Sequence, residues 1–233
     1  MKRAVLAFIA AGLLIIIGAI ISNTTQSNNI KNKTHFNYDK IHGAMLPKTA
    51  SFAGEEVPLD KFYVREALDK ELQVNTYWHS STLMLLKRAN RWFPKIEPIL
   101  NENNLPEDFK YLALIESGLE NVVSPAGAAG FWQIMKGTAR DYGLEVNNDV
   151  DERYHLKKST KTASDFLNKA YEKFGSWTMA AASYNAGMRR INQEIERQQV
   201  NTYYDLHLNT ETSRYIYRIL AVKAIYENPE KFG

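Results

Sequence analysis

The segment KKSTKTASDFLNKAYEKFG, residues 157–175, has the clearest periodicity in the chain and decides its fold class. Six of its residues recur at the helical positions i, i+3, i+4, i+7, i+8 and i+11: Ala163, Phe166, Leu167, Ala170, Tyr171 and Phe174. This spacing places them on one face of an α-helix. Gly175 follows directly, where a left-handed residue commonly ends a helix. The segment therefore predicts an amphipathic helix packed on a helical core.

Most of the chain after Val57 carries similar patterns. Besides residues 157–175, they cover the ranges 58–73, 81–93, 95–104, 106–118, 138–143, 176–187, 188–199 and 209–233. Pro94 is expected to end the second of these, because proline cannot donate the hydrogen bond that a continuing helix needs. No comparable run alternates with the period of two that marks a half-buried strand. We therefore predict an all-α domain in which strands, if any, are minor.

The composition is that of a folded globular domain with appendages, since 45% of the 233 residues are hydrophobic and 24% are charged. The net charge of +3 is too small to predict nucleic-acid binding, although a mildly basic surface suits a polyanionic wall or a membrane face. The absence of cysteine excludes disulfides, thiolate metal sites and a cysteine nucleophile. The histidines are dispersed without paired ligand spacing, so we predict no metal site and no cofactor.

The first 22 residues carry the pattern of an export signal. Lys2 and Arg3 precede an uncharged apolar run of 18 residues, Ala4 to Ile21. No convincing A-x-A cleavage site follows, which favours an uncleaved membrane anchor over a removed signal peptide. The basic residues would then stay in the cytoplasm and the rest of the chain would lie outside. The next residues, 22–40, are rich in Asn, Thr, Ser, Gln and Lys and indicate a flexible tether.

The segment KYLALIESGLE, residues 110–120, places a glutamate on an otherwise apolar helix. The helix is expected to begin at Pro106 and to end at Gly118, so Glu116 lies in its last turn. Leu112 and Phe109 precede Glu116 by four and by seven residues. Desolvation by such neighbours and the negative helix end both raise a carboxyl pKa, which suits a general acid. The alternatives are an ion pair with an Arg or Lys, or a carboxyl that reaches solvent past the helix end.

Two later segments place polar groups where a ligand could bind. Residues 122–135, VVSPAGAAGFWQIM, combine glycines that allow close backbone approach with two aromatic rings and an amide, as in sugar sites. Phe131 and Trp132 could equally fill the core. In ASYNAG, residues 182–187, Tyr184 and Asn185 end an Ala-rich helix and need buried partners.

These motifs resemble a known family in their order and approximate spacing. They are Glu116-Ser117, Gly130-Phe131-Trp132-Gln133, Ser183-Tyr184-Asn185 and Tyr215 within ETSRYIYRILA. The chain from roughly Val57 onward is similar to the lysozyme-like lytic transglycosylases of bacterial peptidoglycan. It is most like the membrane-bound lytic transglycosylase D type, and DERYH, residues 151–155, is also typical of that type. The resemblance implies an all-α, lysozyme-like fold.

The resemblance also implies a reaction. Glu116 would be the single catalytic acid and base, protonating the oxygen between N-acetylmuramic acid and N-acetylglucosamine. As a carboxylate it would then accept the proton of the muramoyl carbon-6 hydroxyl, giving a 1,6-anhydromuramoyl end without consuming water. This differs from the two-carboxylate scheme of most glycosidases.

Further roles are carried over position by position. The residues expected to bind substrate are Ser124, Gly130, Phe131, Trp132, Gln133, Tyr184, Asn185 and Tyr215. Tyr215 matches the tyrosine whose hydroxyl contacts the catalytic carboxyl, although an aromatic in the core stripe of the last helix is an alternative. No metal and no cofactor is implied.

We expect residues 1–22 to be a signal anchor or signal peptide and residues 23–56 a flexible linker. Residues 57–95 would form an N-terminal helical extension and residues 96–233 the catalytic domain. The protein would lie in the cell envelope on the periplasmic side, with the membrane (through residues 4–21) and peptidoglycan strands as its partners. D-type members commonly carry LysM wall-binding repeats and a lipidated cysteine, and the 233 residues contain neither.

Two alternatives stay open. One is a hydrolytic muramidase of the same fold, which needs a second carboxylate to place a water, with Asp141 and Asp149 as candidates. The other is a membrane-tethered wall-binding scaffold that keeps the fold without turnover.

Overall fold

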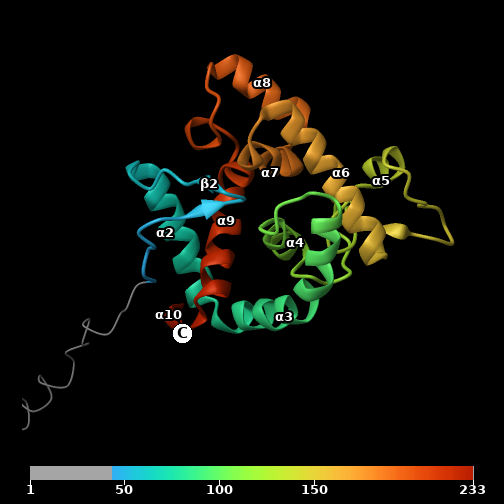
Figure 1. Ribbon diagram of the computed structural model, residues 1–233, viewed down its shortest axis with the longest axis horizontal. Coiled ribbons are helices and arrows are strands. Elements are labelled where there is room, and N and C mark those ends of the chain that lie inside the picture. The colour runs from blue at the N-terminus through green and yellow to red at the C-terminus, as the bar shows by residue number, and fades with distance from the viewer. Residues whose placement is uncertain (1–43, 233) are drawn as a thin grey trace, which may run out of the picture. The chain divides into compact units, whose positions relative to one another are not determined.

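The computed structural model describes residues 44–232 and is mostly helical, as predicted (Figure 1). The apolar run 4–21, expected to be a membrane anchor, lies outside the described residues. Within residues 44–232, no helix combines the length and the apolar character needed to cross a membrane.

The α-helices are α2 (Phe62–Tyr77), α3 (His79–Glu102), α4 (Phe109–Ser117), α5 (Lys136–Asp141), α6 (Leu156–Phe174), α7 (Trp177–Ala186), α8 (Met188–Gln198), α9 (Thr210–Glu227) and α10 (Pro229–Phe232). The short elements are β1 (Ser51–Phe52), β2 (Glu55–Glu56), and the 3-10 helices η2 (Glu152–Tyr154) and η3 (Tyr203–Asp205).

Helix α6 confirms the amphipathic helix that was predicted for residues 157–175. It ends at Gly175, whose φ of 64° is left-handed as expected. Ala163, Leu167 and Ala170 are buried, and Tyr171 at the edge of the predicted face stacks on Trp177 with ring centroids 3.9 Å apart.

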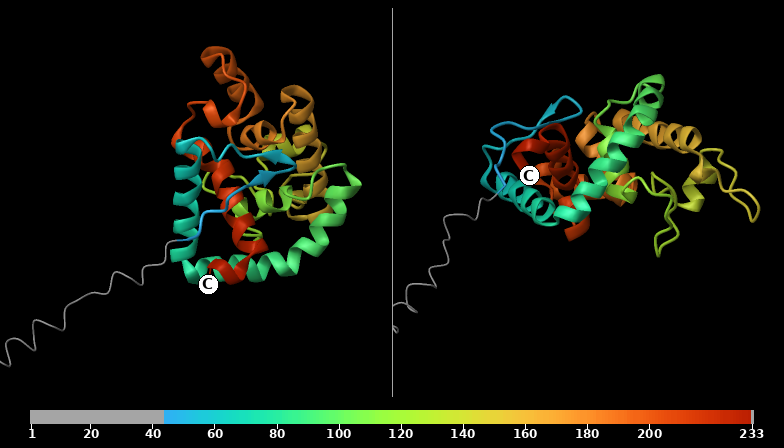
Figure 2. Two further views of the ribbon diagram at one scale, coloured as in Figure 1. Left: turned by 60° about the vertical axis from the view of Figure 1, so that its left-hand side comes forward. Right: turned by 90° about the horizontal axis from the view of Figure 1, so that it is seen from below.

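Helix α3 corrects the expectation that Pro94 ends a helix. It continues through Pro94 and Pro98 to Glu102 and is visibly bent (Figures 1 and 2). Proline deletes a hydrogen bond and kinks a helix without having to stop it. Phe93 before the first proline and Ile96 after it are both buried, so core packing holds the two halves of α3 together.

Helix α4 begins at Phe109 and not at Pro106, because the residues from Pro106 onward form turns whose carbonyls accept from the N–H groups of the first helical turn. It contacts both α3 and α9 (Figure 1). Its buried residues are Phe109, Tyr111, Leu112, Ala113 and Leu114. Burial on nearly every side fixes the position of its last turn.

A short hairpin lies inside the range 23–56 that the sequence assigns to a linker. Strands β1 and β2 pair antiparallel around Ala53 and Gly54, both with positive φ as in two-residue hairpin turns. Phe52 is fully buried, with its ring centroid 5.1 Å from that of Phe109. Glu55 accepts hydrogen bonds from the backbone N–H of Trp177 and of Thr178, at the start of α7. The packed part of the chain therefore includes residues before Val57.

Candidate active site

Glu116 projects from the last turn of α4, directly before the left-handed Gly118 (φ 62°). Glu116 is half-buried, and its Oε1 accepts a hydrogen bond from the hydroxyl of Tyr215 on α9. Tyr215 itself is buried, so its hydroxyl is held in place by the core. The packing of α9 against α4 thus brings together two residues that are 99 positions apart.

Burial raises the pKa of Glu116, which confirms the predicted direction. The hydrogen bond from Tyr215 and the positive charge of Arg218 act the opposite way, and the negative charge of Glu211 adds to the rise. Arg218 donates to the carbonyl of Ile115 (3.1 Å). Among residues 44–232, no basic group lies within 4.0 Å of the Glu116 carboxyl as an ion pair. The geometry therefore favours an acid of raised pKa over a structural ion pair.

Tyr184 and Asn185 at the end of α7 are half-buried, and their polar groups are hydrogen-bonded. The Tyr184 hydroxyl donates to the backbone carbonyl of Trp132 (2.7 Å). Asn185 donates to Glu211 (3.0 Å) and accepts from Thr212 (2.7 Å), both on the first turn of α9. Burial raises the pKa of Tyr184 and the charge of Glu116 raises it further, so Tyr184 lies within electrostatic reach of the carboxyl.

The loop from Val122 to Ile134 is folded on itself and tied to α4. Isolated antiparallel bridges join Val123 to Ala129 and Ala129 to Ile134. The hydroxyl of Ser117, the residue after Glu116, donates to the carbonyl of Phe131 (2.9 Å). This bond holds the middle of the loop beside the end of α4.

The side chains of Gln133 and Ser124 are used within that loop. Gln133 donates to the carbonyls of Gly130 (2.8 Å) and Val122 (3.1 Å). The Ser124 hydroxyl accepts from the N–H of Ala128 (3.0 Å) and closes a turn. Gln133 and Tyr184 also line a groove of about 80 Å³, so the loop and the end of α7 share a concave surface.

The two aromatic residues of the loop belong to the core. Trp132 is completely buried, and its indole N–H donates to Thr160 on α6 (2.8 Å). Phe131 is 6% exposed, and its ring meets that of Trp92 edge to face at 4.8 Å. These contacts favour the core interpretation of both side chains over direct contact with a sugar, because a ligand cannot reach a buried indole. The backbone carbonyls of both residues remain part of the site.

Gly130 is required by a contact within the protein. Its φ is 78°, and a Cβ at this position would lie 2.2 Å from the carbonyl oxygen of Arg153. Arg153 is buried and donates to the carbonyls of Gly127 (2.8 Å) and Ile134 (3.0 Å). It also forms an ion pair with Asp151 (2.6 Å), which caps η2. Arg153 therefore holds both ends of the glycine-containing turn.

Sequence reasoning missed Glu211, Arg218 and the clamp formed by Arg153. Glu211 and Arg218 lie four residues before and three after Tyr215, so they share its face of α9. That periodicity could have identified them once Tyr215 was assigned. The hydrogen bonds from Arg153 to the carbonyls of Gly127 and Ile134 could not be predicted, because no sequence pattern marks a backbone carbonyl as an acceptor.

Comparisons with known proteins bear on this arrangement. Residues 94–206 match the family model described as Transglycosylase SLT domain. Membrane-bound lytic murein transglycosylase D of Escherichia coli is 30% identical over 192 residues, which cover 78% of this chain and 42% of that protein. A putative tributyltin chloride resistance protein of Alteromonas sp. is 28% identical over 121 residues, covering 51% of this chain and 58% of that one. The chain thus spans less than half the length of the first relative and less than two thirds of the second.

Two solved structures are also similar. The 70 kDa soluble lytic transglycosylase of Escherichia coli has a TM-score of 0.49 and 18% identity, over 70% of this chain and 31% of that chain. An inactive mutant of a lytic transglycosylase from Pseudomonas aeruginosa has a TM-score of 0.45 and 19% identity, over 58% and 24%. The similarity to this family rests on the family model and on the relative of 30% identity. Residues 94–206 are therefore similar to the Transglycosylase SLT domain, and the family that the chain resembles is that of the lysozyme-like peptidoglycan lytic transglycosylases.

Proposed function

We propose that the protein is a peptidoglycan lytic transglycosylase that cleaves between N-acetylmuramic acid and N-acetylglucosamine and leaves 1,6-anhydromuramoyl ends. The observation that carries this proposal is Glu116, an acid whose pKa is raised by burial and whose carboxyl accepts from Tyr215. A carboxyl that holds its proton near neutral pH can act as a general acid. The match to the SLT family model and the relative named as a murein transglycosylase support the same reaction.

In the first step, protonated Glu116 gives its proton to the bridging oxygen as the bond from that oxygen to the muramoyl anomeric carbon breaks. In the second step, the carbon-6 hydroxyl oxygen of the same sugar bonds to the anomeric carbon, and its proton passes to the Glu116 carboxylate. No water is consumed, and Glu116 regains its proton. The Tyr215 hydroxyl stabilises the carboxylate between the two steps, because a hydrogen bond to the charged form favours that form.

Substrate binding is assigned to the groove side of the loop 122–134 and to the end of α7. Gln133 and Tyr184 line the groove of about 80 Å³ there, and Ser124, Gly130 and Asn185 belong to the same segments. Phe131 and Trp132 support this surface from below through their packing. The peptidoglycan strand is the proposed partner.

The envelope location, the periplasmic side and anchoring through residues 4–21 also stay proposals. They rest on the apolar amino-terminal run and on a relative whose name describes it as membrane-bound. The division into an anchor (1–22), a linker, a helical extension and a catalytic domain up to residue 233 has the same status. The buried Phe52 argues for moving the end of the linker before residue 51.

The chemical form of the product tests the reaction. Purified sacculi digested with the protein and examined by mass spectrometry should release anhydromuramoyl ends, which are lighter than reducing ends by one water. Reducing ends alone would instead indicate a hydrolase. Asp141 and Asp149, the candidates for a water-placing carboxylate, are both exposed, whereas the acid whose charge acts on Glu116 is Glu211.

Replacing Tyr215 by phenylalanine should move the pH dependence of lysis. The Tyr215 hydrogen bond lowers the pKa of Glu116, so its loss should raise that pKa and shift the alkaline limb of the rate profile to higher pH. The measurement is the rate of sacculus lysis across the pH range. The control, Tyr226→Phe, deletes another α9 hydroxyl, bonded to Asn90 (3.2 Å), and should leave the limb in place. A limb that stays or moves to lower pH in Tyr215→Phe would argue against this role.

A further inference from the structure

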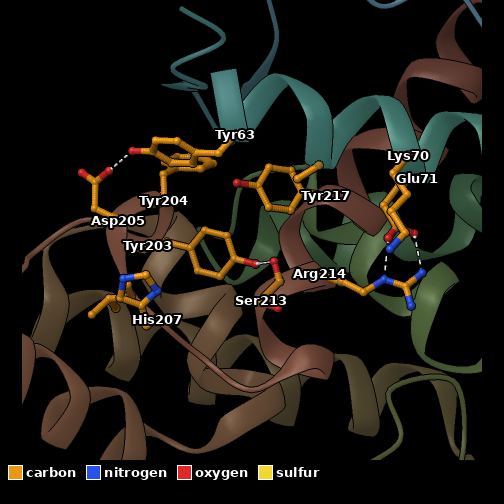
Figure 3. A pocket seen from close by; sticks show the side chains of 12 residues that line it. Tyr63, Lys70, Glu71, Tyr203, Tyr204, Asp205, His207, Ser213, Arg214 and Tyr217 are labelled. Carbon is orange, nitrogen blue, oxygen red and sulfur yellow. Dashed lines mark hydrogen bonds and ion pairs between the residues drawn. The ribbon is translucent and has the colours of Figure 1, made fainter. Parts of the chain in front are cut away.

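A pocket of about 550 Å³ opens on another side of α9 (Figure 3). We call it the tyrosine pocket, because its walls include Tyr63, Tyr203, Tyr204 and Tyr217. These rings come from α2, from η3 and from α9, which are far apart in the sequence. The rings of Tyr203 and Tyr204 meet edge to face at 5.5 Å, and Tyr217 lies 6.1 Å from Tyr203. The volume lies within the range typical of small-molecule sites.

The tyrosine pocket is separate from the Glu116 carboxyl although both use α9. Arg214 lines the pocket, and the next residue, Tyr215, donates to Glu116. Successive residues of an α-helix point about 100° apart, so the two side chains leave α9 in different directions. Ser213 and Tyr217 extend the pocket face, whereas Glu211 and Arg218 act on Glu116. The pocket therefore lies next to the candidate active site without being part of it.

Two ion pairs lie around the tyrosine pocket, and the exposed Lys70 adds one further positive charge to its lining. Arg214 donates to both carboxylate oxygens of Glu71, through Nε at 2.6 Å and Nη2 at 3.1 Å (Figure 3). Asp205 is paired with Lys61 (2.6 Å) and also accepts from the Tyr63 hydroxyl. A site for a phosphate or another anion would present an excess of positive charge. Here the excess is limited to Lys70 at an exposed position, and the other charges are paired, so the aromatic walls favour an uncharged polar ligand instead.

Several polar groups remain directed at the pocket. The Tyr217 hydroxyl points into it, and His207 lies on its rim (Figure 3). The two bonds to Glu71 do not use Nη1 of Arg214, which leaves that nitrogen to donate. Tyr63 is half-exposed and can offer a ring face, whereas Tyr203 and Tyr217 line the pocket with little exposed surface. A ring face with hydroxyl and guanidinium donors near it matches a sugar ring, which has apolar C–H surfaces and a rim of hydroxyls.

We propose that the tyrosine pocket is a second, non-catalytic carbohydrate site that takes a short uncharged stretch of N-acetylhexosamine units. The choice of this sugar class rests on the proposed function, whereas the aromatic walls and paired charges are properties of the pocket itself. Such a site gives the domain a hold on a glycan strand that does not depend on the reacting sugars.

The test uses the full chain with Glu116→Gln, so that the ligand is not consumed, and N-acetylglucosamine tetramer as the probe. Hydrogen exchange with mass spectrometry should show that the tetramer protects residues 203–207 and 63–70. Tyr63→Ala and Tyr217→Phe should each weaken this protection about threefold to tenfold, as expected for the loss of one contact. Tyr63 is half-exposed, and Tyr217→Phe keeps its ring, so both variants should fold. The matched control is Tyr77→Ala, on the same helix and outside the pocket, and it should change nothing.

Absence of protection at residues 203–207 at saturating tetramer would overturn the proposal, as would equal protection in Tyr63→Ala. Protection there by a free stem peptide but not by the tetramer would also overturn it and would identify a peptide site. The sacculus digest is scored separately. If the digest gives anhydromuramoyl ends but the tetramer protects nothing, only the second site is contradicted. If the tetramer protects residues 203–207 but the digest gives no such ends, only the proposed reaction is contradicted.

Discussion

Glu116→Gln should lower the release of muropeptides from purified sacculi by about three orders of magnitude, within the range for loss of a general acid–base group. Glutamine keeps the shape of the side chain and can still accept from Tyr215, but it has no proton of the required acidity to give. The measurement is the initial rate of product release, quantified by chromatography and mass spectrometry. A variant that cleaves as fast as the natural protein would remove Glu116 from the mechanism.

Stability provides the control for this variant. Since burial raises the folded-state pKa of Glu116 above 4.5, the folded protein holds this proton more tightly than the unfolded chain. The resulting contribution to stability is complete below pH 4.5 and is lost as the pH rises through the raised pKa. Glutamine does not ionise, so the variant loses no stability in this way as the pH rises. Thermal unfolding at neutral pH should therefore find Glu116→Gln at least as stable as the natural protein, and a markedly lower melting temperature would mean that inactivity reflects misfolding.

Gly130→Ala should destabilise the protein by about 3 kcal/mol, the sum of left-handed backbone strain and overpacking. The added Cβ would lie 2.2 Å from the carbonyl oxygen of Arg153, a backbone atom that cannot rotate away. The displacement would also disturb the Arg153 bonds to Gly127 and Ile134. Urea denaturation followed by circular dichroism measures the change, and the rate of lysis should fall with it.

Gly127→Ala is the matched control, because Gly127 has a φ of 84° and a Cβ there would meet no atom within 4 Å. It should cost only the strain, about 1 kcal/mol. The difference between the two variants isolates the contact with Arg153. Equal losses in both would show that backbone conformation alone makes Gly130 necessary.

Local features of the fold could be predicted from the sequence because their causes are local. Gly118 and Gly175 end α4 and α6 in the left-handed conformation, as single glycines after periodic runs should. The apolar neighbours of Glu116 similarly fixed the direction of its pKa shift. The prediction that Pro94 ends a helix was wrong. A proline within a helix costs about 3 kcal/mol, and the burial of Phe93 and Ile96 can offset this cost.

Features that depend on distant partners could not be derived in this way. The pairing of Glu116 with Tyr215 spans 99 residues and was expected only from the family resemblance. Trp132 could not be assigned to core or cleft from its neighbours, because its partner Thr160 lies on α6, 28 residues farther along the chain. The close approach of the Arg153 backbone to Gly130 likewise depends on a residue 23 positions away, and no pattern around Gly130 predicts it.

The hairpin at residues 51–56 limits how far this domain can be shortened at its amino-terminal end. The family model begins at residue 94, yet Glu55 caps the helix that carries Tyr184 and Asn185, and Asp108 accepts from Ala53 and from Lys223. A fragment trimmed to the matched region would leave the start of α7 without this carboxylate and a gap where Phe52 packs. We therefore expect the smallest fragment that folds by itself to be longer than residues 94–206, and recombinant fragments should start upstream of Ser51.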